Sequence, residues 1–261
     1  MTLQLSILKH YGLFDDYKKQ LKIDIEHSFD SIKKKTQTIE DFKFYLANAA
    51  VHSSNIEGNT VSFDTYLKAI EFNLHLKTKE IKEIEDLMDA YQFARENDLT
   101  LDNILKGHEI LTQSILLKKE RGKIRKVKVG VRSEGRLIYL AVEPEFVKQE
   151  LVKLFSDISI LLQSKLTTTE IFYYAAYIHL VFVNIHPFVD GNGRATRLIE
   201  KWFLAKKLGD NAWFITSEKN YWYNRPFYYK NLQIGVNYYE VKYEISIPFL
   251  LMLPNSLLEN A

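Results

Sequence analysis

The 261-residue chain contains no cysteine, and glycine (10) and proline (5) are both scarce. The absence of cysteine excludes a disulfide-stapled secreted scaffold, a thiolate zinc finger and a cysteine nucleophile. Few glycines and prolines are typical of a chain that is mostly helical. No repeat, low-complexity tract or flexible linker divides the chain, so we expect a single domain over residues 1–261.

An excess of one charge sign is also missing, because 35 Lys and Arg residues stand against 33 Asp and Glu, for a formal net charge of +2. This balance gives no electrostatic basis for gripping a long nucleic acid, although a local basic patch is still possible. The N-terminus lacks a signal-peptide pattern. The longest apolar stretch, residues 171–185, is shorter than the ~20 residues of a bilayer span. We therefore expect a cytoplasmic protein with no membrane contact.

The spacing of apolar residues predicts the fold class. The stretch 126–142 alternates Val127, Val129 and Val131, turns around 133–135 and returns through a β-rich run, which predicts a β-hairpin. Such a hairpin is marginal alone and must lean on helices, where it often forms a flap over a site. The sequence thus predicts an all-α fold with one β-hairpin flap. Helical spacing predicts helices over 14–35, 38–57, 62–76, 78–96, 100–117, 143–163, 168–184, 193–208, 222–239 and 244–258.

The densest set of reactive side chains lies in the sequence HPFVDGNGRATR, at residues 186–197. A proline-marked turn ends the apolar helix there, and a new helix begins near Gly193. The glycines of this loop can adopt positive φ, which turns successive N–H groups inward at a helix N-terminus, where an anion is favoured. Arg194 and Arg197 are three residues apart and share one helix face. The loop therefore predicts a cradle for a polyphosphate.

A carboxylate and an imidazole stand beside this cradle. Asp190 is an oxygen ligand of the kind that holds Mg²⁺ together with substrate phosphates. His186 supplies an imidazole, whose ordinary pKa is near neutrality and which is the usual group for taking a proton from an attacking hydroxyl. A Rossmann loop is excluded because position 196 is Thr and the preceding segment is helical, and a calcium loop is excluded by Arg194 and Ala195.

The segment HPFVDGNGRATR resembles, position for position, the signature HxFx(D/E)GNGRxxR of Fic-domain (Fido-fold) proteins. Most of these are adenylyltransferases that move AMP from ATP to a protein hydroxyl. The resemblance implies that His186 is the base acting on a Tyr, Ser or Thr of the target and that Asp190 holds Mg²⁺. It also implies a phosphate site made by the amides of Gly191, Asn192 and Gly193, with Arg194 beside them and Arg197 at the γ-phosphate.

The resemblance extends to both sides of the signature. The hairpin stands at the family's flap position, where an exposed strand edge could align a target segment by strand addition. The flap residues would be Lys128, Val129, Gly130 and Val131. The stretch 224–229 resembles the family's C-terminal nucleotide-side element, which implies that the nucleotide is approached by Asn224, Tyr228 and Tyr229.

The sequence SSNIEGN at residues 53–59 predicts an autoinhibitory segment. Gly58 ends a helix in the usual manner, which leaves Glu57 at the negative helix end, where an opposing cation would stabilise it. The segment resembles the family's inhibitory motif (S/T)xxxE(G/N), with Ser53, Glu57 and Gly58 on the matching positions. The resemblance implies that Glu57 pairs with Arg197 and displaces the γ-phosphate. It also divides the chain into an inhibitory helix region at about 38–59 and a catalytic core at about 98–240.

The sequence therefore predicts an ATP- and Mg²⁺-dependent protein adenylyltransferase of the class with an N-terminal inhibitory helix. Removal of AMP from a client protein by the same site stays open, because Glu57 could align a water. A module that senses nucleotide or binds DNA without turnover is the third alternative, although every catalytic position of the signature is filled. Family resemblance also suggests a homodimer and modification of the chain itself. His179, within the apolar helix, is expected to be a core residue.

Overall fold

The computed structural model describes residues 3–8, 12–34, 38–72, 78–133 and 135–258. Within these ranges the helices are joined by turns and loops and the strands form one antiparallel β-hairpin, which confirms the predicted fold class. Lys35, residues 73–76 and Glu134, on which the sequence predicts two helix ends and the hairpin tip, lie outside the described residues. None of the helices in these ranges has the length and apolar character needed to cross a bilayer.

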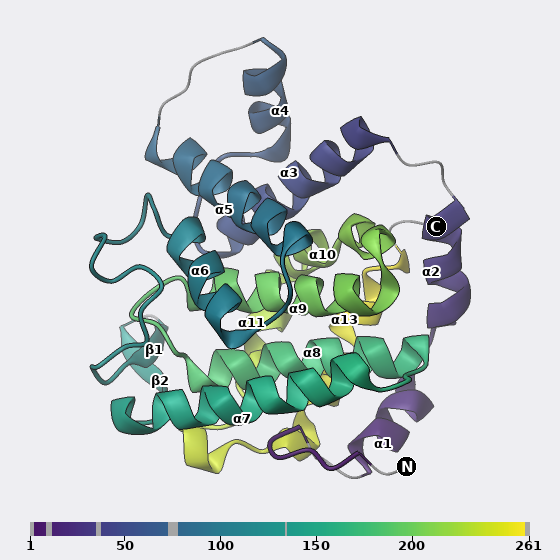
Figure 1. Ribbon diagram of the computed structural model, residues 1–261, viewed down its shortest axis with the longest axis vertical. Helices are drawn as coiled ribbons and strands as arrows, with labels where there is room; N and C mark the ends of the chain where they lie inside the picture. The colour runs from purple at the N-terminus through teal and green to yellow at the C-terminus, as the bar shows by residue number, and fades with distance from the viewer. Residues whose placement is uncertain (1–2, 9–11, 35–37, 73–77, 134, 259–261) are drawn as a thin grey trace.

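Two helices that lie side by side form the centre of the molecule, α8 (Thr168–Ile185) and α9 (Asn192–Leu208) (Figure 1). Buried residues occur around most of α8, as expected of a helix that is apolar on all sides. α7 (Pro144–Gln163) packs on α8, while α5 (Lys79–Glu96) and α6 (Leu101–Leu111) pack on α9. The loop that joins the two central helices is therefore held at one end of the core.

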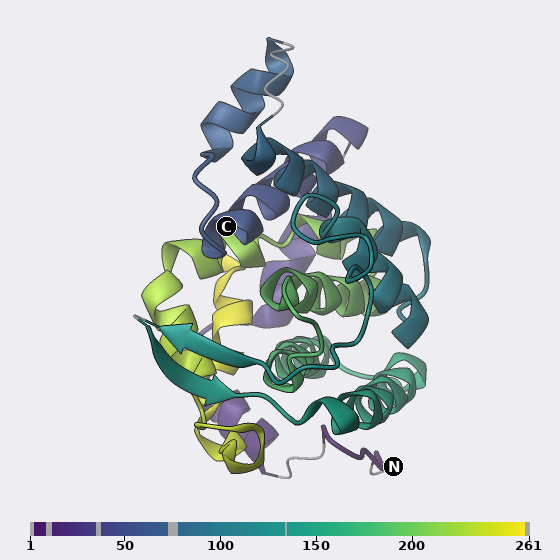
Figure 2. The ribbon, with the colours of Figure 1, turned by 90° about the vertical axis from the view of Figure 1, so that its left-hand side faces the viewer.

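The hairpin lies beside that end of the central helices, as the view along them shows (Figure 2). It consists of β1 (Gly130–Ser133) and β2 (Arg136–Leu140). The hydroxyl of Tyr139 donates to the carbonyl of Asn184 at 2.8 Å, and this bond ties β2 to the last turn of α8. The expected support of the hairpin by helices is thus present.

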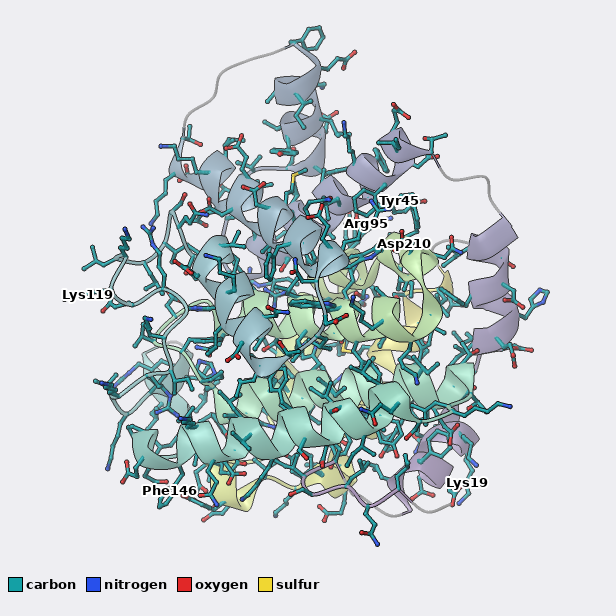
Figure 3. All side chains as sticks on the ribbon, in the orientation of Figure 1. Lys19, Tyr45, Arg95, Lys119, Phe146 and Asp210 are labelled. Atoms are coloured by element: carbon teal, nitrogen blue, oxygen red, sulfur yellow. The ribbon has the colours of Figure 1, made fainter. Side chains whose placement is uncertain are left out.

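The helix that ends near Glu57 is α3 (Ile39–Ile56), which packs against α5, α9 and α10 (Ser217–Tyr223). Thr38 and Asp41 begin it with a reciprocal capping box. Its N-terminal half is held by Arg95, whose guanidinium lies 4.0 Å from the ring centroid of Phe42 and pairs with Asp210 at 2.8 Å (Figure 3).

From Leu46 to Ile56 every residue of α3 is buried, so the C-terminal end of this helix lies against the core and not in solvent. The short helix that follows, α4 (Phe63–Glu71), projects from the body of the molecule instead (Figures 1 and 2).

Several predicted helix boundaries are wrong. The predicted helix 14–35 is two helices, because the side chain of Asp24 accepts from the N–H of His27 and begins a second helix. The predicted helix 100–117 ends at Leu111, where the hydroxyl of Thr112 donates back to His108. The resulting elements are α1 (Leu13–Gln20), α2 (Ile25–Lys34) and α6.

The C-terminal predictions are corrected in the same way. The predicted helix 222–239 is replaced by the end of α10 and by α11 (Arg225–Leu232), because Pro226 lacks an N–H and favours the first turn of a new helix. The predicted helix 244–258 is two single turns, α12 (Ile247–Leu250) and α13 (Met252–Asn255). Helical periodicity alone does not register such breaks.

Candidate active site

A cavity of about 150 Å³ lies where α3, the hairpin, the ends of the two central helices and α11 meet. It brings together side chains that are far apart in the sequence. Its lining residues are Glu57, Val131, Ile138, Tyr139, Val183, Asn184, His186, Gly193, Tyr228, Tyr229, Leu232 and Gln233.

His186 ends α8 in a left-handed conformation, with φ 52°, and among the described residues it is the only non-glycine with positive φ. Its N–H donates to the carbonyl of Phe182 at 3.1 Å. Its ring Nδ1 lies 3.1 Å from the carbonyl of Val183. Because a carbonyl only accepts, Nδ1 carries the proton of the neutral ring and Nε2 keeps the lone pair that a general base needs.

The pKa of His186 is lowered from its ordinary value. Burial is the main cause, because it disfavours the charged imidazolium, and the nearby guanidinium of Arg125 acts in the same direction. The hydrogen bond to Val183 and the carboxylates of Glu57 and Asp190 act against this shift without reversing it. The imidazole is therefore neutral at pH 7 and able to accept a proton.

The loop after His186 is fixed from inside. The side chain of Asn192 bonds both the N–H and the carbonyl of Phe188, each at 2.9 Å. The ring of His108 stacks on Phe188 with centroids 3.5 Å apart and bonds the carbonyl of Asp190 at 2.9 Å. Burial lowers the pKa of His108 to about 4, so this ring is neutral as well. The loop is thus rigidly attached to α6.

The two glycines of the loop have different roles. Gly191 has a φ of 77° and caps α9, as expected. Gly193, for which the sequence also allows positive φ, lies instead inside the first helical turn, which corrects that expectation. A Cβ at Gly193 would lie 2.1 Å from Oε1 of Glu57, so a side chain there would require the carboxylate to move. The Glu57 carboxylate therefore stands at the N-terminal end of α9, where an anion is stabilised.

The predicted pairing of Glu57 with Arg197 is present, at 2.7 Å. Arg197 is only 1% exposed, and its Nε and one terminal nitrogen donate to the hydroxyl and the carbonyl of Ser53 at 2.8 and 3.0 Å. Burial opposes ionisation of Glu57, but the guanidinium groups of Arg197 and Arg194 outweigh it and hold the pKa of Glu57 below its ordinary value. The inhibitory motif predicted from the sequence thus contacts the second arginine of the signature.

The first arginine of the signature is paired too. Arg194 donates to Glu83 of α5 at 2.9 Å, and the side chains are 7% and 14% exposed. The sequence gives no reason to select Glu83 among the acidic residues of α5, because only the packing of α5 on α9 brings it to this place. Both guanidinium groups of the predicted phosphate cradle therefore face carboxylates of the chain itself.

Asp190 is exposed, and its Oδ1 accepts from the N–H of Gly191 at 2.6 Å. In the described part of the chain no three His, Asp or Glu side chains form a metal-binding group. Mg²⁺ is commonly held by one or two carboxylates together with substrate phosphates and water. A single exposed carboxylate next to an anion site fits that type of coordination, so Asp190 fits the predicted ion.

The residues predicted on the nucleotide side are only partly brought together. Tyr228 and Tyr229 line the cavity, and the hydroxyl of Tyr229 donates to the carbonyl of Ile56 at the end of α3. Asn224 is not among the residues that line this cavity. Its amide instead donates to the carbonyl and to Oδ1 of Asn220, at 3.0 and 2.8 Å, where α10 ends.

The flap residues are likewise divided. Gly130 and Val131 belong to β1, whereas Lys128 and Val129 precede it, and of the four only Val131 lines the cavity. The carbonyl of Val129 still accepts from the N–H of Ala141 at 3.1 Å, so strand-like pairing begins before β1.

A buried chain of hydrogen bonds supports Arg197 from the core side. Glu200 accepts from Nδ1 of His179 at 2.7 Å, and Nε2 of His179 lies 3.0 Å from the hydroxyl of Tyr228. That hydroxyl accepts from Arg197 at 3.2 Å, so its own proton points to His179. His179 is 0% exposed, which confirms it as a core residue, and its partners fix the position of Arg197.

The part of the chain that contains the loop 186–197 is similar to known proteins. A family model described as Fic/DOC family matches residues 98–204. The protein adenylyltransferase fic-1 of Caenorhabditis elegans is 33% identical over 160 residues, which cover 57% of this chain and 29% of that protein. The protein adenylyltransferase Fic of Nematostella vectensis is 28% identical over 158 residues, covering 57% and 35%. The chain spans about a third of the length of the curated relatives it matches.

Solved structures show the same fold. A Fic family protein from Desulfovibrio desulfuricans superposes with a TM-score of 0.73 at 20% identity, over 100% of this chain and 75% of that one. A fragment of Fic-1 from Caenorhabditis elegans gives a TM-score of 0.67 at 20% identity, over 95% and 70%. The helical architecture around the cavity is therefore shared with these proteins.

Proposed function

Because residues 98–204 of the chain form a Fic/DOC-family domain, we propose that it is a protein adenylyltransferase that moves AMP from ATP to a Tyr, Ser or Thr hydroxyl of a protein. The observation that carries the proposal is one cavity lined by a neutral imidazole, His186, and by Gly193 at a helix N-terminus, next to Arg197. A base and an anion site that line one cavity are what hydroxyl attack on a nucleotide phosphate requires.

The transfer step follows from these positions. Nε2 of His186 accepts the proton of the target hydroxyl as its oxygen attacks the α-phosphorus of ATP. The new phosphorus–oxygen bond joins AMP to the target, and the bond to the β-phosphate breaks, so that pyrophosphate leaves. The free N–H groups at the start of α9 and the guanidinium of Arg197 bind the phosphate oxygens. Positioning and charge neutralisation carry the rate, without a covalent enzyme intermediate.

Asp190 would hold Mg²⁺ together with the nucleotide phosphates, and the ion would supply further neutralisation of phosphate charge. The hairpin would align the target, because an extended peptide segment can add to an exposed strand edge. Here Val131 and Tyr139 line the cavity, so a segment held along β1 would reach the base.

Glu57 gives this site its resting state in the proposal. Its carboxylate occupies the N-terminal end of α9 and pairs with Arg197, which are the two groups that would receive the γ-phosphate. A triphosphate and this carboxylate compete for the same donors, so ATP binds productively only when Glu57 leaves. The region of α3 would thus act as an inhibitory helix before the catalytic core.

Removal of AMP from a modified client is the second candidate activity. It is favoured by the presence of both Glu57 and His186 in the lining of one cavity, where the carboxylate can orient a water toward a phosphodiester. In that direction the water oxygen bonds to phosphorus, the bond to the client oxygen breaks, and the client hydroxyl regains its proton.

The proposal is tested by incubating the chain with Mg²⁺ and ATP labelled on the α-phosphate or, separately, on the γ-phosphate. We expect label from the α-phosphate alone to become attached to protein, with a mass increase of one AMP on the chain itself or on a lysate protein. Transfer of γ-label would instead indicate a phosphotransferase. A client already carrying AMP, incubated without ATP, reports the reverse activity by its loss of that mass.

The acid side of the pH–rate profile provides a further prediction. The kcat/KM of a Glu57→Gly variant should fall only below pH 6.5, the ordinary pKa of imidazole, because burial lowers the pKa of His186 and its neutral form persists to lower pH. The carboxylate of Glu57 raises the pKa of His186, so its removal in this variant lets that pKa stay below the ordinary value. Rates measured from about pH 5 to 8 locate the limb. A limb above the ordinary imidazole value contradicts the assignment of His186 as a buried base.

A further inference from the structure

Arg125 is a buried cation that the motif analysis does not select. It is 2% exposed, in the segment that connects α6 to the hairpin. Its backbone N–H donates to the carbonyl of Pro187, at 2.9 Å, in the loop that follows His186. Burial lowers the pKa of Arg125, yet guanidinium groups keep their charge in proteins, so this one must be stabilised by the groups around it.

The guanidinium of Arg125 donates to the end of α8 on one side. Its Nε lies 2.7 Å from the carbonyl oxygen of His186, and a terminal nitrogen lies 3.4 Å from that of Ile185. The last carbonyls of a helix have no partner within the helix and carry its partial negative charge. Arg125 therefore supplies these carbonyls with donors and a positive charge, and one of the two carbonyls belongs to His186, the residue with positive φ.

On its other side the same guanidinium donates to both legs of the hairpin. One terminal nitrogen lies 2.9 Å from the carbonyl of Val127, before β1, and the other lies 2.5 Å from the carbonyl of Val142, after β2. These two residues lie at the base of the hairpin, where its two legs leave the helical body. A planar fork with five N–H donors can bridge such a set of carbonyls, whereas a lysine ammonium is a point charge with three donors.

We propose that Arg125 is a positioning residue of the transfer reaction, which fixes the hairpin that would hold the target relative to the backbone of the base His186. The inference rests on the proposed function, because it assigns Arg125 to the geometry of that step. It does not place Arg125 in contact with ATP, since its hydrogen bonds go to main-chain carbonyls of the chain itself. Loss of Arg125 should therefore slow transfer without weakening nucleotide binding.

The test compares Arg125→Gln and Arg125→Lys in a Glu57→Gly background. The control is Arg121→Gln, because Arg121 also donates to a main-chain carbonyl in the same segment, that of Leu116 at 2.8 Å, away from the hairpin. We expect kcat to fall by about 10²-fold in Arg125→Gln, as misplacement of reacting groups by ~1 Å does, while the Kd for ATP stays unchanged. Arg125→Lys should be more thermally stable than Arg125→Gln but should regain little of its kcat. Arg121→Gln should leave both kcat and the Kd for ATP unchanged.

Hydrogen exchange separates failure of this inference from failure of the proposed function. In Arg125→Gln, the amides of Ala141 and His186 should exchange faster than in the Glu57→Gly parent, while amides of α9 keep their protection. If the Glu57→Gly parent transfers no AMP, the proposed function is wrong. Unchanged exchange at the amides of Ala141 and His186 overturns the positioning role, whether or not the parent is active. The role is also overturned if ATP affinity falls in parallel with kcat, or if Arg125→Lys restores full transfer.

Discussion

Replacement of His186 by alanine is expected to lower AMP transfer by about 10²–10⁴-fold while ATP still binds, because a positioned general base contributes that much to a proton transfer. The imidazole lines the cavity, is neutral at pH 7 and keeps Nε2 free of the proton held at Nδ1. Its loss removes the proton acceptor but leaves Gly193 and Arg197, which would bind the phosphates. Single-turnover transfer and ATP titration measure the two effects separately.

The backbone at His186 requires a second variant. With φ 52°, alanine at this position adds strain that is unrelated to catalysis. Asparagine tolerates the left-handed conformation better and offers no group that can act as a base at pH 7. His186→Asn should therefore lose transfer to the same extent as His186→Ala but keep a higher thermal stability. An exposed histidine, His27 on α2, provides the control, and full transfer by either variant at 186 would remove this residue from its role.

Replacement of Glu57 by glycine is expected to raise AMP transfer by about 10–100-fold, if the carboxylate restricts the competent state to 1–10% of the population. The ion pair with Arg197 holds the donors that the γ-phosphate needs, so its removal frees them at once. The apparent Kd for ATP should fall by the same factor, because a state that is rarely populated weakens apparent affinity in proportion. Self-labelling and ATP titration measure both quantities.

Glu57→Gln separates charge from bulk. The amide keeps the size of the side chain but loses the charge that pairs with Arg197, so we expect an intermediate increase in transfer. Glu109→Gln, on the exposed face of α6, removes a carboxylate paired with Lys106 and should leave transfer unchanged. Equal activity of wild type and Glu57→Gly, with the same thermal stability, would show that the pair does not restrain the site.

The parts of the site that could be predicted from the sequence are those whose geometry is local. His186, Asp190 and the start of α9 lie within a few residues of one another, so a helix end, a loop and a helix start fix their relation. Glu57 lies far from Arg197 along the chain, and only the resemblance to an inhibitory motif connected the two. The structure then supplied a contact of 2.7 Å.

The parts that could not be predicted depend on tertiary packing. The pairing of Arg194 with Glu83 arises because α5 packs on α9, which no local pattern encodes. Arg125 stands among other basic residues and differs from them only in being enclosed by the hairpin and α8. The predicted helix 222–239 is broken at Asn224, and the side chain of this residue bonds the end of α10, a placement that helical periodicity does not encode.

The bonds between Arg197 and Ser53 do not involve Glu57, and this independence determines how the site opens. When the Glu57 side chain swings away, the guanidinium stays anchored to α3, and neither the helix nor the arginine needs to refold. Side-chain rotations take picoseconds to nanoseconds at exposed positions, whereas local unfolding takes microseconds or longer. If opening needs only this rotation, inhibition depends on how often Glu57 occupies the phosphate site and not on a slow conformational step. Residual AMP transfer by the wild type would then rise with nucleotide concentration and show no lag.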